Sequence, residues 1–414
     1  MEAAKVIAGL TRMVRDVGLA EDFAQEALLA ALQQWPASGI PSNPGAWLMA
    51  AGKRRAIDYF RHNARTGRKH EEIGRDLLEL ERTLPDFDES LDDPIGDDLL
   101  RLIFIACHPI LAREARAALT LRVVGGLTTG EIARAFLVPE PTIAQRIVRA
   151  KNTLARKRIP FEVPRGSDLA ARLASVLEVL YLIFNEGYSA TGGQDLIRVS
   201  LCEEALRLGR ILAELAPGEA EVHGLVALME IQASRSRARI GPNGEPILLL
   251  DQNRALWDRL LIRRGLAALD RAERLSAVKG PYRLQAEIAA CHARALAAAE
   301  TDWARIVSLY GELAAIAPSP VVELNRAVAV SRASGPEAAL VLLDPLIKDP
   351  LMKTYHLLPS VRGDLLARLG RHAEARAEFE RAGSLTRNSR EQALLADRAR
   401  ESERKAREAA QSGL

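Results

Sequence analysis

The residues best suited to specific chemistry lie in one short stretch of the chain. Thr128 and Glu131 have the T-x-x-E spacing of a capping box, which predicts that a helix begins here. A turn follows at 136–140, and Pro141 suits the first turn of a second helix over 142–155. Two helices joined by so short a turn are typical of a helix-turn-helix, whose second helix enters the major groove of DNA.

The second of these helices carries side chains that recognise bases and phosphates. Arg and Gln can pair bidentately with guanine and adenine edges, and Lys binds phosphate oxygens. The predicted contacts with an upstream DNA element are Thr142, Gln145, Arg146, Arg149 and Lys151. The alternative is a plain three-helix bundle whose basic face is only solvated.

The charges of the chain are arranged in blocks that its net charge of +3 conceals. Basic stretches at 53–69 and 146–158 flank an acidic stretch at 71–98. Clustered Lys and Arg gain free energy by releasing counterions from phosphates, so two basic blocks predict a polyanion contacted at two places.

The composition predicts helices and several domains. Of the 414 residues, 48% are hydrophobic and only 4% aromatic, and Ala, Leu, Arg and Glu are abundant. A single hydrophobic core rarely grows beyond about 250–300 residues. No apolar run reaches the roughly 20 residues of a membrane span, and the first residues lack a signal-peptide pattern, so a cytoplasmic location is expected.

Common catalytic and metal-binding patterns are missing from the sequence. Cys107, Cys202 and Cys291 are far apart, and the histidines have no metal-ligand spacing. The nucleotide-binding, esterase and zinc-protease motifs do not occur. The sequence therefore predicts no enzyme activity, no metal and no cofactor.

The second half of the chain repeats. The pairs Trp303-Ala304, Glu337-Ala338 and Glu374-Ala375 are spaced 34 and 37 residues apart, and each precedes an apolar helix. This period, with an alanine at a helix crossing, is typical of tetratricopeptide repeats that stack into an α-solenoid. Two segments interrupt the helices before the repeats: 184–188, and 239–245 with a hairpin turn at Asn243-Gly244. Each is either a ligand or partner site or a connector.

The first 60 residues carry a resemblance. The sequence LAEDFAQEA at 19–27, followed by AWL at 46–48 and RAIDYFR at 55–61, resembles region two of extracytoplasmic-function sigma factors. The helix-turn-helix lies where region four of that family belongs. The long remainder resembles the subgroup with a C-terminal tetratricopeptide-like extension, so the expected fold class is all-α: two small helical sigma domains, an acidic linker and an α-solenoid.

The resemblance implies partners and site residues. Core RNA polymerase would bind through its clamp to Asp22, Gln25 and Glu26. The helical pattern breaks from Trp35 to Gly45, which predicts a loop. This loop would read a flipped base of the downstream promoter element, and the next helix would hold the DNA backbone. The residues implied are Ser38, Gly39, Ser42, Asn43, Lys53, Arg54, Arg55 and Arg61. The subgroup is also associated with small YCII-like (DGPF) proteins, which implies a possible regulatory partner for the extension.

The expected organisation follows from these assignments. The ranges are 1–70 for region two, 71–96 for the acidic linker, 97–160 for region four, 165–280 for a helical extension, 281–400 for the repeats and 401–414 for a charged tail. The leading hypothesis is an alternative sigma factor controlled by its own extension. The alternatives are a helix-turn-helix regulator whose solenoid senses a ligand or protein, and a repeat scaffold with an incidental basic bundle.

Overall fold

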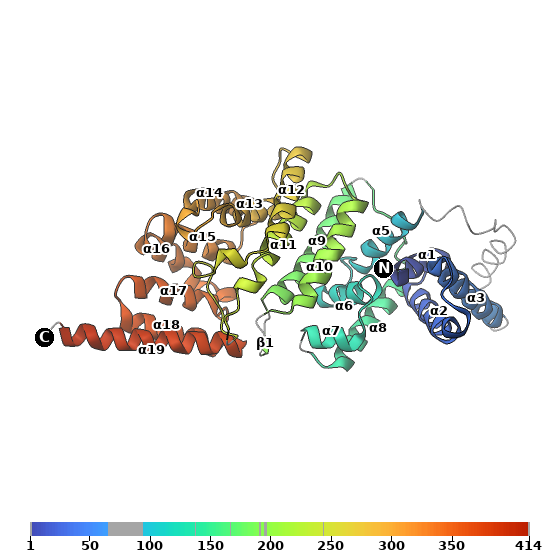
Figure 1. The fold of residues 1–414 in the computed structure, drawn as a ribbon, viewed down its shortest axis with the longest axis horizontal. Coiled ribbons are helices and arrows are strands. Elements are labelled where there is room, and N and C mark those ends of the chain that lie inside the picture. The colour runs from blue at the N-terminus through green and yellow to red at the C-terminus, as the bar shows by residue number, and fades with distance from the viewer. Residues whose placement is uncertain are drawn as a thin grey trace. The chain divides into compact units, whose positions relative to one another are not determined.

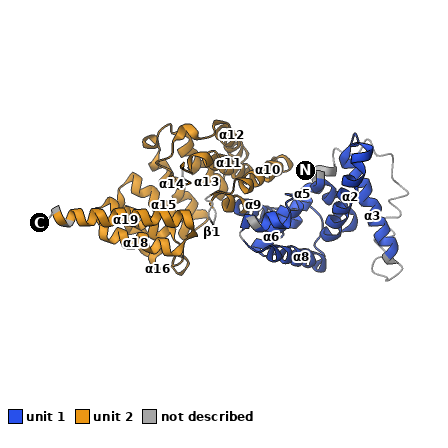
Figure 2. Ribbon diagram, turned by 60° about the horizontal axis from the view of Figure 1, so that its bottom comes forward, with its two compact units in different colours: residues 1–182 blue, residues 183–414 orange. Residues whose placement is uncertain are grey.

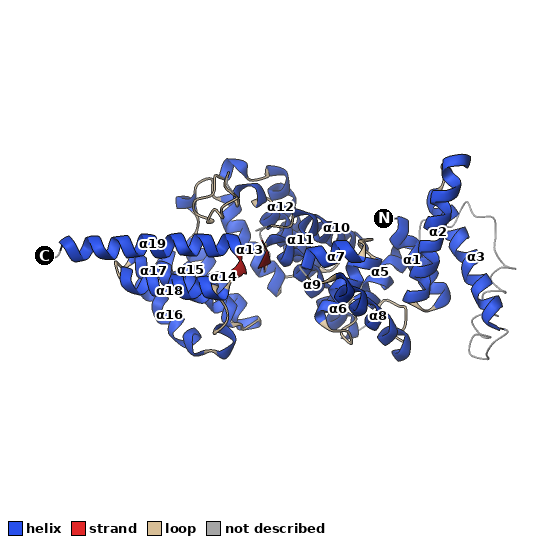
Figure 3. Ribbon diagram, turned by 90° about the horizontal axis from the view of Figure 1, so that it is seen from below, coloured by secondary structure: helices blue, strands red, loops and turns tan. Residues whose placement is uncertain are grey.

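The computed structural model describes residues 2–64, 94–136, 138–165, 167–189, 192–193, 197–242 and 244–412. They form two compact units, residues 1–182 and 183–414 (Figure 2). Helices dominate both units, and the described residues contain one pair of two-residue strands, β1 (Gly192–Gly193) and β2 (Arg387–Asn388), which pair in parallel (Figure 3). The predicted all-α class is confirmed.

The first unit begins with three helices packed on one another, α1 (Glu2–Val14), α2 (Val17–Ser38) and α3 (Pro44–Ala64) (Figure 1). Helix α2 starts where the Asp16 carboxylate accepts hydrogen bonds from the Gly18 and Leu19 amides, at 2.7 and 3.0 Å. It continues past the expected loop start at Trp35, with Pro36 in its last turn. Gly39, at φ +81°, then donates its N–H to the Trp35 carbonyl and ends the helix.

The same unit continues with α5 (Pro94–Ala106), α6 (Arg113–Val123), α7 (Thr129–Phe136), α8 (Glu140–Lys157) and α9 (Ser167–Tyr188). The predicted capping box is present: the Thr128 amide donates to Glu131 Oε2 at 2.7 Å, and the Glu131 amide donates to Thr128 Oγ1 at 3.2 Å. Helices α7 and α8 form the predicted helix-turn-helix. Most of the predicted acidic linker lies outside the described residues, and its last three residues belong to α5.

The second unit is a succession of helices that pack mainly on their neighbours in sequence. Its helices after α9 are α10 (Val199–Leu215), α11 (Ala220–Ala233), α12 (Arg259–Leu275), α13 (Pro281–Arg294), α14 (Trp303–Ile316), α15 (Pro320–Ala333), α16 (Pro336–Lys348), α17 (Leu357–Arg368), α18 (His372–Leu385) and α19 (Ser389–Ser412). The predicted charged tail continues α19 as far as Ser412.

The predicted repeat corresponds to helix pairs, because its three marker positions fall at the starts of α14, α16 and α18. The predicted alanine at each helix crossing needs correction in two repeats. Ala304 and Ala338 are exposed, and the buried residues at these crossings are Ile306 and Ala339. Only Ala375 is buried as predicted, because a one-residue shift on a helix turns a side chain by about 100°.

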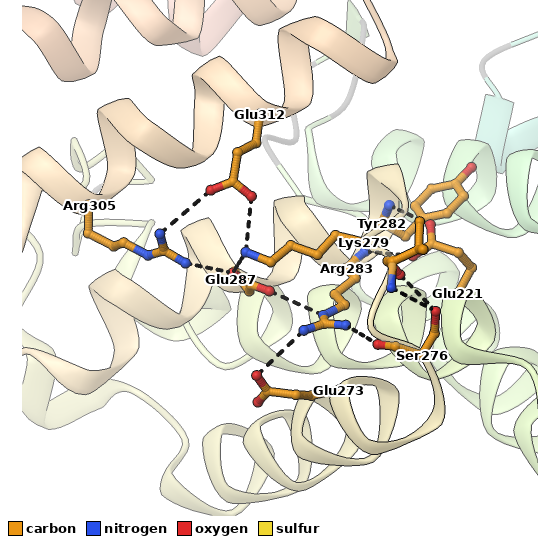
Figure 4. Close-up of polar contacts among 10 residues, drawn as sticks. Glu221, Glu273, Ser276, Lys279, Tyr282, Arg283, Glu287, Arg305 and Glu312 are labelled. Atoms are coloured by element: carbon orange, nitrogen blue, oxygen red, sulfur yellow. Dashed lines mark hydrogen bonds and ion pairs between the residues drawn. The ribbon is translucent and has the colours of Figure 1, made fainter.

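A buried arginine links four helices of the second unit (Figure 4). Arg283, only 4% exposed, donates to the Ser276 carbonyl at 2.6 Å and pairs with Glu287 at 3.2 Å and Glu273 at 3.5 Å. Glu287 also binds Lys279 at 3.0 Å and Arg305 at 3.2 Å. The network ties α12, α13 and α14 together, and Glu221 of α11 caps α13 by accepting from the amides of Tyr282 and Arg283.

Among the described residues, no helix has both the length and the apolar character needed to cross a membrane.

Candidate nucleic-acid interface

Helix α8 has a buried face and an exposed face. Ile143, Ile147, Ala150 and Leu154 are buried against the rest of the bundle. The opposite face exposes Ala144, Gln145, Val148, Arg149 and Asn152. Gln145 and Arg149, both predicted to read bases, are therefore one helical turn apart on the same exposed face.

Three of the predicted upstream contacts lie elsewhere on α8. Thr142 and Arg146 are partly buried, at the edge of the exposed face. Lys151 points to α2, where its Nζ lies 2.5 Å from Oε2 of Glu21 and its side chain is 18% exposed. The structure thus brings Gln145 and Arg149 together and separates Lys151 from them.

Val148 is a candidate contact that the sequence reasoning missed. It is 54% exposed, although valine is normally buried, and it lies between Gln145 and Arg149 on the exposed face. Apolar side chains in this position can contact the methyl group of thymine. The signal was present in the sequence, because Val148 falls outside the apolar positions 143, 147, 150 and 154 that form the core stripe.

Glu21 joins the first helical module to the helix-turn-helix. Its carboxylate is 3% exposed and accepts from Arg122 Nε at 2.6 Å as well as from Lys151. Ion pairs between residues far apart in the chain leave no periodic pattern, so this contact could not be predicted from the sequence. Glu21 is therefore a second residue that the sequence reasoning missed.

The predicted clamp-binding residues are neighbours of Glu21 on α2. Asp22 and Glu26 are exposed, and Gln25 is partly buried and donates to Glu21 Oε1 at 2.6 Å. Burial raises the pKa of the Asp22 carboxyl, and the charge of Lys151 opposes this shift. All three residues share one side of α2, one helical turn apart or less.

The predicted specificity loop lies between α2 and α3. Ser38, the last residue of α2, donates its hydroxyl to the Gln34 carbonyl at 2.9 Å. Asn43 caps α3, because its Oδ1 accepts from the Ala46 amide at 3.0 Å. Gly39 and Ser42 are exposed. The edge-to-face contact of Trp35 with Trp47, with ring centroids 5.5 Å apart, packs the two ends of the loop together.

The basic residues of α3 differ in their surroundings. Arg54 and Arg61 are exposed, and Arg55 pairs with Glu26 of α2 at 3.3 Å, so a predicted DNA contact touches a predicted clamp contact. Burial, with the nearby charge of Arg12, lowers the pKa of Lys53. Arg65, Arg68 and Lys69, at the end of the basic stretch, lie outside the described residues.

The part of the chain that the structure describes holds no cluster of His, Cys, Asp and Glu able to bind a metal ion. Burial raises the pKa of Cys107 to about 11 and of Cys202 to about 12, so both thiols are protonated at neutral pH. Cys107 and Cys202 are buried core residues, and Cys291 is partly buried.

Comparisons with known proteins agree with this geometry. Residues 2–66 match Sigma-70 region 2, residues 101–154 match Sigma-70, region 4, and residues 172–273 match a family of unknown function (DUF6596). An uncharacterized protein of Rhizobium meliloti (strain 1021) is 46% identical over 393 residues, which cover 94% of this chain and 92% of that protein. No solved structure matches the chain.

Regions 2 and 4 in one chain define the class, a sigma factor of transcription initiation. The chain belongs to the extracytoplasmic-function type of sigma factor that carries a C-terminal extension. Sigma factor families are not enzymes, and their regions 2 and 4 indicate core RNA polymerase and promoter DNA as partners.

Proposed function

We propose that this sigma factor reads the upstream promoter element with the exposed face of α8. Gln145 and Arg149 would contact base edges, and Thr142 and Arg146 would contact the flanking backbone. The observation that carries the proposal is the exposure of Gln145, Val148 and Arg149 together on a helix-turn-helix. In the described residues Arg149 has no ion-pair partner, so its guanidinium is available for a guanine edge.

The first helical module would hold the polymerase and the downstream element. Asp22, Gln25 and Glu26 would bind the clamp through one side of α2. Gly39 and Ser42 would meet a flipped base in the exposed loop, with Ser38 and Asn43 shaping it, since their side chains already bond to the backbone. Lys53, Arg54, Arg55 and Arg61 would hold DNA phosphates along α3.

Lys151 can contact a phosphate only after it leaves Glu21. The ion pair also holds Gln25, which donates to the same carboxylate. Binding of α2 to the polymerase clamp and of α8 to DNA would therefore both compete with the contact between the two modules. The proposed function thus includes separation of α2 from α8 when the sigma factor joins polymerase at a promoter.

The extension would control this activity, and a small YCII-like protein remains a partner predicted from the family resemblance alone. Truncation after Tyr188 tests the control. It keeps the α9 contacts of the first unit, in which Arg172 donates to the Phe104 carbonyl at 3.0 Å and Ser175 to the Cys107 carbonyl at 2.6 Å. We expect altered promoter output from the truncated chain, and unchanged output with unchanged polymerase affinity would contradict control by the extension.

Polymerase binding is tested by equilibrium titration of the full chain with core enzyme. The double variant Asp22→Ala, Glu26→Ala should bind core at least about tenfold more weakly, as expected for the loss of two interface charges of about 0.7 kcal/mol or more each. Glu114→Ala is the matched control, because Glu114 is an exposed acidic residue on α6. Equal affinity of the double variant and the control would rule out this side of α2 as the clamp-binding surface.

A further inference from the structure

Of the two segments expected to interrupt the helices, 184–188 does not: it forms the last turn of α9, and only the described residues of 239–245 lie outside a helix. The two segments meet in the structure. Tyr188 is the last residue of α9, and Arg239 opens the hairpin closed by the bridge between Ile240 and Pro246. The Arg239 guanidinium stacks on the Tyr188 ring, with Cζ 3.8 Å from the ring centroid, and donates a hydrogen bond to the Tyr188 carbonyl. Each of the two segments therefore supplies a residue to one contact.

This contact is one end of a longer stack, which we call the arginine–aromatic ladder: Arg239, Tyr188, Arg235, Trp257 and Arg254. Arg235 Cζ lies 5.9 Å from the Tyr188 ring centroid and 5.8 Å from that of Trp257. Arg254 Cζ lies 4.8 Å from the Trp257 centroid. Cation–π attraction holds such alternating stacks together, and three guanidinium groups are thereby gathered around two rings.

Several donors of the ladder have no hydrogen-bond acceptor. Trp257 is 3% exposed, and its indole Nε1 is buried without a partner in the part of the chain described. The same holds for the Nε atoms of Arg235 and Arg254. Buried polar atoms are nearly always hydrogen-bonded, and leaving one unsatisfied costs about 1–3 kcal/mol. The ladder therefore holds three buried donors that no described acceptor satisfies.

The guanidinium groups of the three ladder arginines differ in the hydrogen-bond acceptors that the protein offers them. Arg254 donates to the His292 and Ala295 carbonyls, both at 2.6 Å, and to Thr301 Oγ1 at 3.1 Å. Arg239 donates to a carbonyl. The side chain of Arg235 has no hydrogen bond and no ion pair with any described residue, and Arg235 is partly exposed at the middle of the ladder. Its uncompensated charge is the part of the ladder that a ligand can reach.

The electrostatics of a neighbouring residue support this reading. Burial and the charges of Arg235 and Arg254 lower the pKa of His292 to about 4. Two carboxylates act on the ladder from a distance, Glu391 on Arg239 and Glu300 on Arg254. Neither carboxylate forms an ion pair with a ladder arginine in the described part of the chain, and Arg235 has no ion pair with any described residue, so its charge is available to an anion.

We propose that the arginine–aromatic ladder binds an oxyanion, a phosphate or carboxylate group of a ligand, between Arg235 and the indole N–H of Trp257. A guanidinium offers a planar fork of donors that fits two oxygens of either group. The aromatic rings hold Arg235 in place, so little side-chain entropy is lost on binding. All five ladder residues fall within 172–273, the segment that matches the family of unknown function. The inference concerns the extension and does not depend on the proposed promoter contacts.

The test is thermal unfolding of the full chain in inorganic phosphate or in acetate, with sodium chloride at the same ionic strength as reference. A ligand that binds only the folded state raises the melting temperature, by roughly 3–6 °C at ten times its dissociation constant for a unit of this size. We expect a saturable rise with at least one of the two anions. A larger rise in phosphate assigns the site to phosphate groups, and a larger rise in acetate assigns it to carboxylates.

Three variants make the test specific. Arg235→Gln removes the charge and Arg235→Lys keeps it without the planar fork, and both should lose most of the anion-dependent rise. Arg237→Gln is the matched control, because Arg237 is an exposed arginine two residues away in the same short helix, and it should behave as wild type. If Arg235 only supports the fold, its loss would lower the melting temperature equally in all salts. That result, or a wild-type rise no greater than in chloride, would overturn the proposal.

Discussion

Several arginines of α8 and α3 in the first unit differ from many arginines of the second unit in whether a carboxylate holds them. Arg54, Arg146 and Arg149 make no ion pair with a described residue. Many arginines of the second unit pair with carboxylates, as Arg210 does with Glu230 at 2.8 Å and Arg398 with Asp364 at 2.9 Å. The abundance of arginine alone therefore does not identify a binding surface.

Within the second unit, Arg235 differs from exposed arginines without an ion pair, such as Arg237, because its guanidinium lies near the rings of Tyr188 and Trp257. It resembles Arg149 in having no ion-pair partner among the described residues, although Arg149 is surrounded by solvent. The comparison separates two outcomes of mutation. Removing a buried, paired arginine such as Arg283 should cost stability, and removing an unpaired arginine at a proposed site, Arg149 or Arg235, should cost binding.

The largest effect is expected at the paired Arg283. Arg283→Ala leaves Glu287 and Glu273 without this partner and opens a buried site, which should lower the free energy of unfolding by about 3–5 kcal/mol. Urea unfolding followed by circular dichroism measures the change. Arg371→Ala is the control, since its pair with Glu374 at 2.7 Å is solvent-exposed and its loss should leave the free energy of unfolding near wild type. Similar losses of unfolding free energy in both variants would contradict the expected difference between buried and exposed ion pairs.

A pH effect of about 2 kcal/mol is expected from His292. Its pKa is about 4 in the folded chain against about 6.5 in the unfolded chain, so the unfolded chain binds more protons between these values. The free energy of unfolding should therefore fall as the pH is lowered, by roughly 2 kcal/mol between pH 7 and pH 5. His292→Gln, measured at both pH values, should lose this part of the decrease. If the free energy of unfolding of the variant falls with pH as much as that of the wild type, other groups cause the decrease.

Loss of the unpaired Arg149 should weaken DNA binding and leave stability unchanged, the opposite of the effect expected at Arg283. Arg149→Ala is expected to weaken binding to a cognate promoter duplex by about 1–3 kcal/mol, roughly 5- to 150-fold. Its unfolding free energy and its affinity for core polymerase should stay near wild type, because Arg149 is exposed. Fluorescence anisotropy with labelled duplex and a polymerase titration measure the two affinities. Equal losses in both would contradict the assignment of α8 to DNA.

The smallest effect concerns Lys151, which is paired in the structure and proposed to bind phosphate. Glu21→Gln removes the carboxylate that holds Lys151, and one more phosphate contact should steepen the plot of log affinity against log salt by about 0.9. Glu114→Gln supplies the control at an exposed acidic site. An unchanged slope for Glu21→Gln would show that Lys151 stays away from the DNA backbone.

The sequence correctly predicted the features of the fold that depend on residues close together in the chain. The capping box of Thr128 and Glu131, the helix start at Pro141 and the helix pairs of the repeat all follow from spacings of a few residues or a fixed period. The start of the loop after α2 was wrong by four residues, because Gly39 rather than Trp35 ends the helix.

Contacts between distant residues could not be predicted in this way. Glu21 meets Arg122 across 101 positions, and the ladder collects residues from Tyr188 to Trp257. Nothing in the local pattern distinguishes Arg235 from the paired arginines around it. Tertiary packing decides which charge has a partner, so the candidate sites on α8 were visible in the sequence and the ladder was not.

Run-off transcription in vitro tests the central claim most directly. Core RNA polymerase, the full chain and a template carrying its promoter should give a transcript from a defined start, and Arg149→Ala should reduce it while Arg371→Ala leaves it unchanged. A transcript of equal yield without the chain, or with Arg149→Ala equal to wild type, would contradict promoter reading by α8.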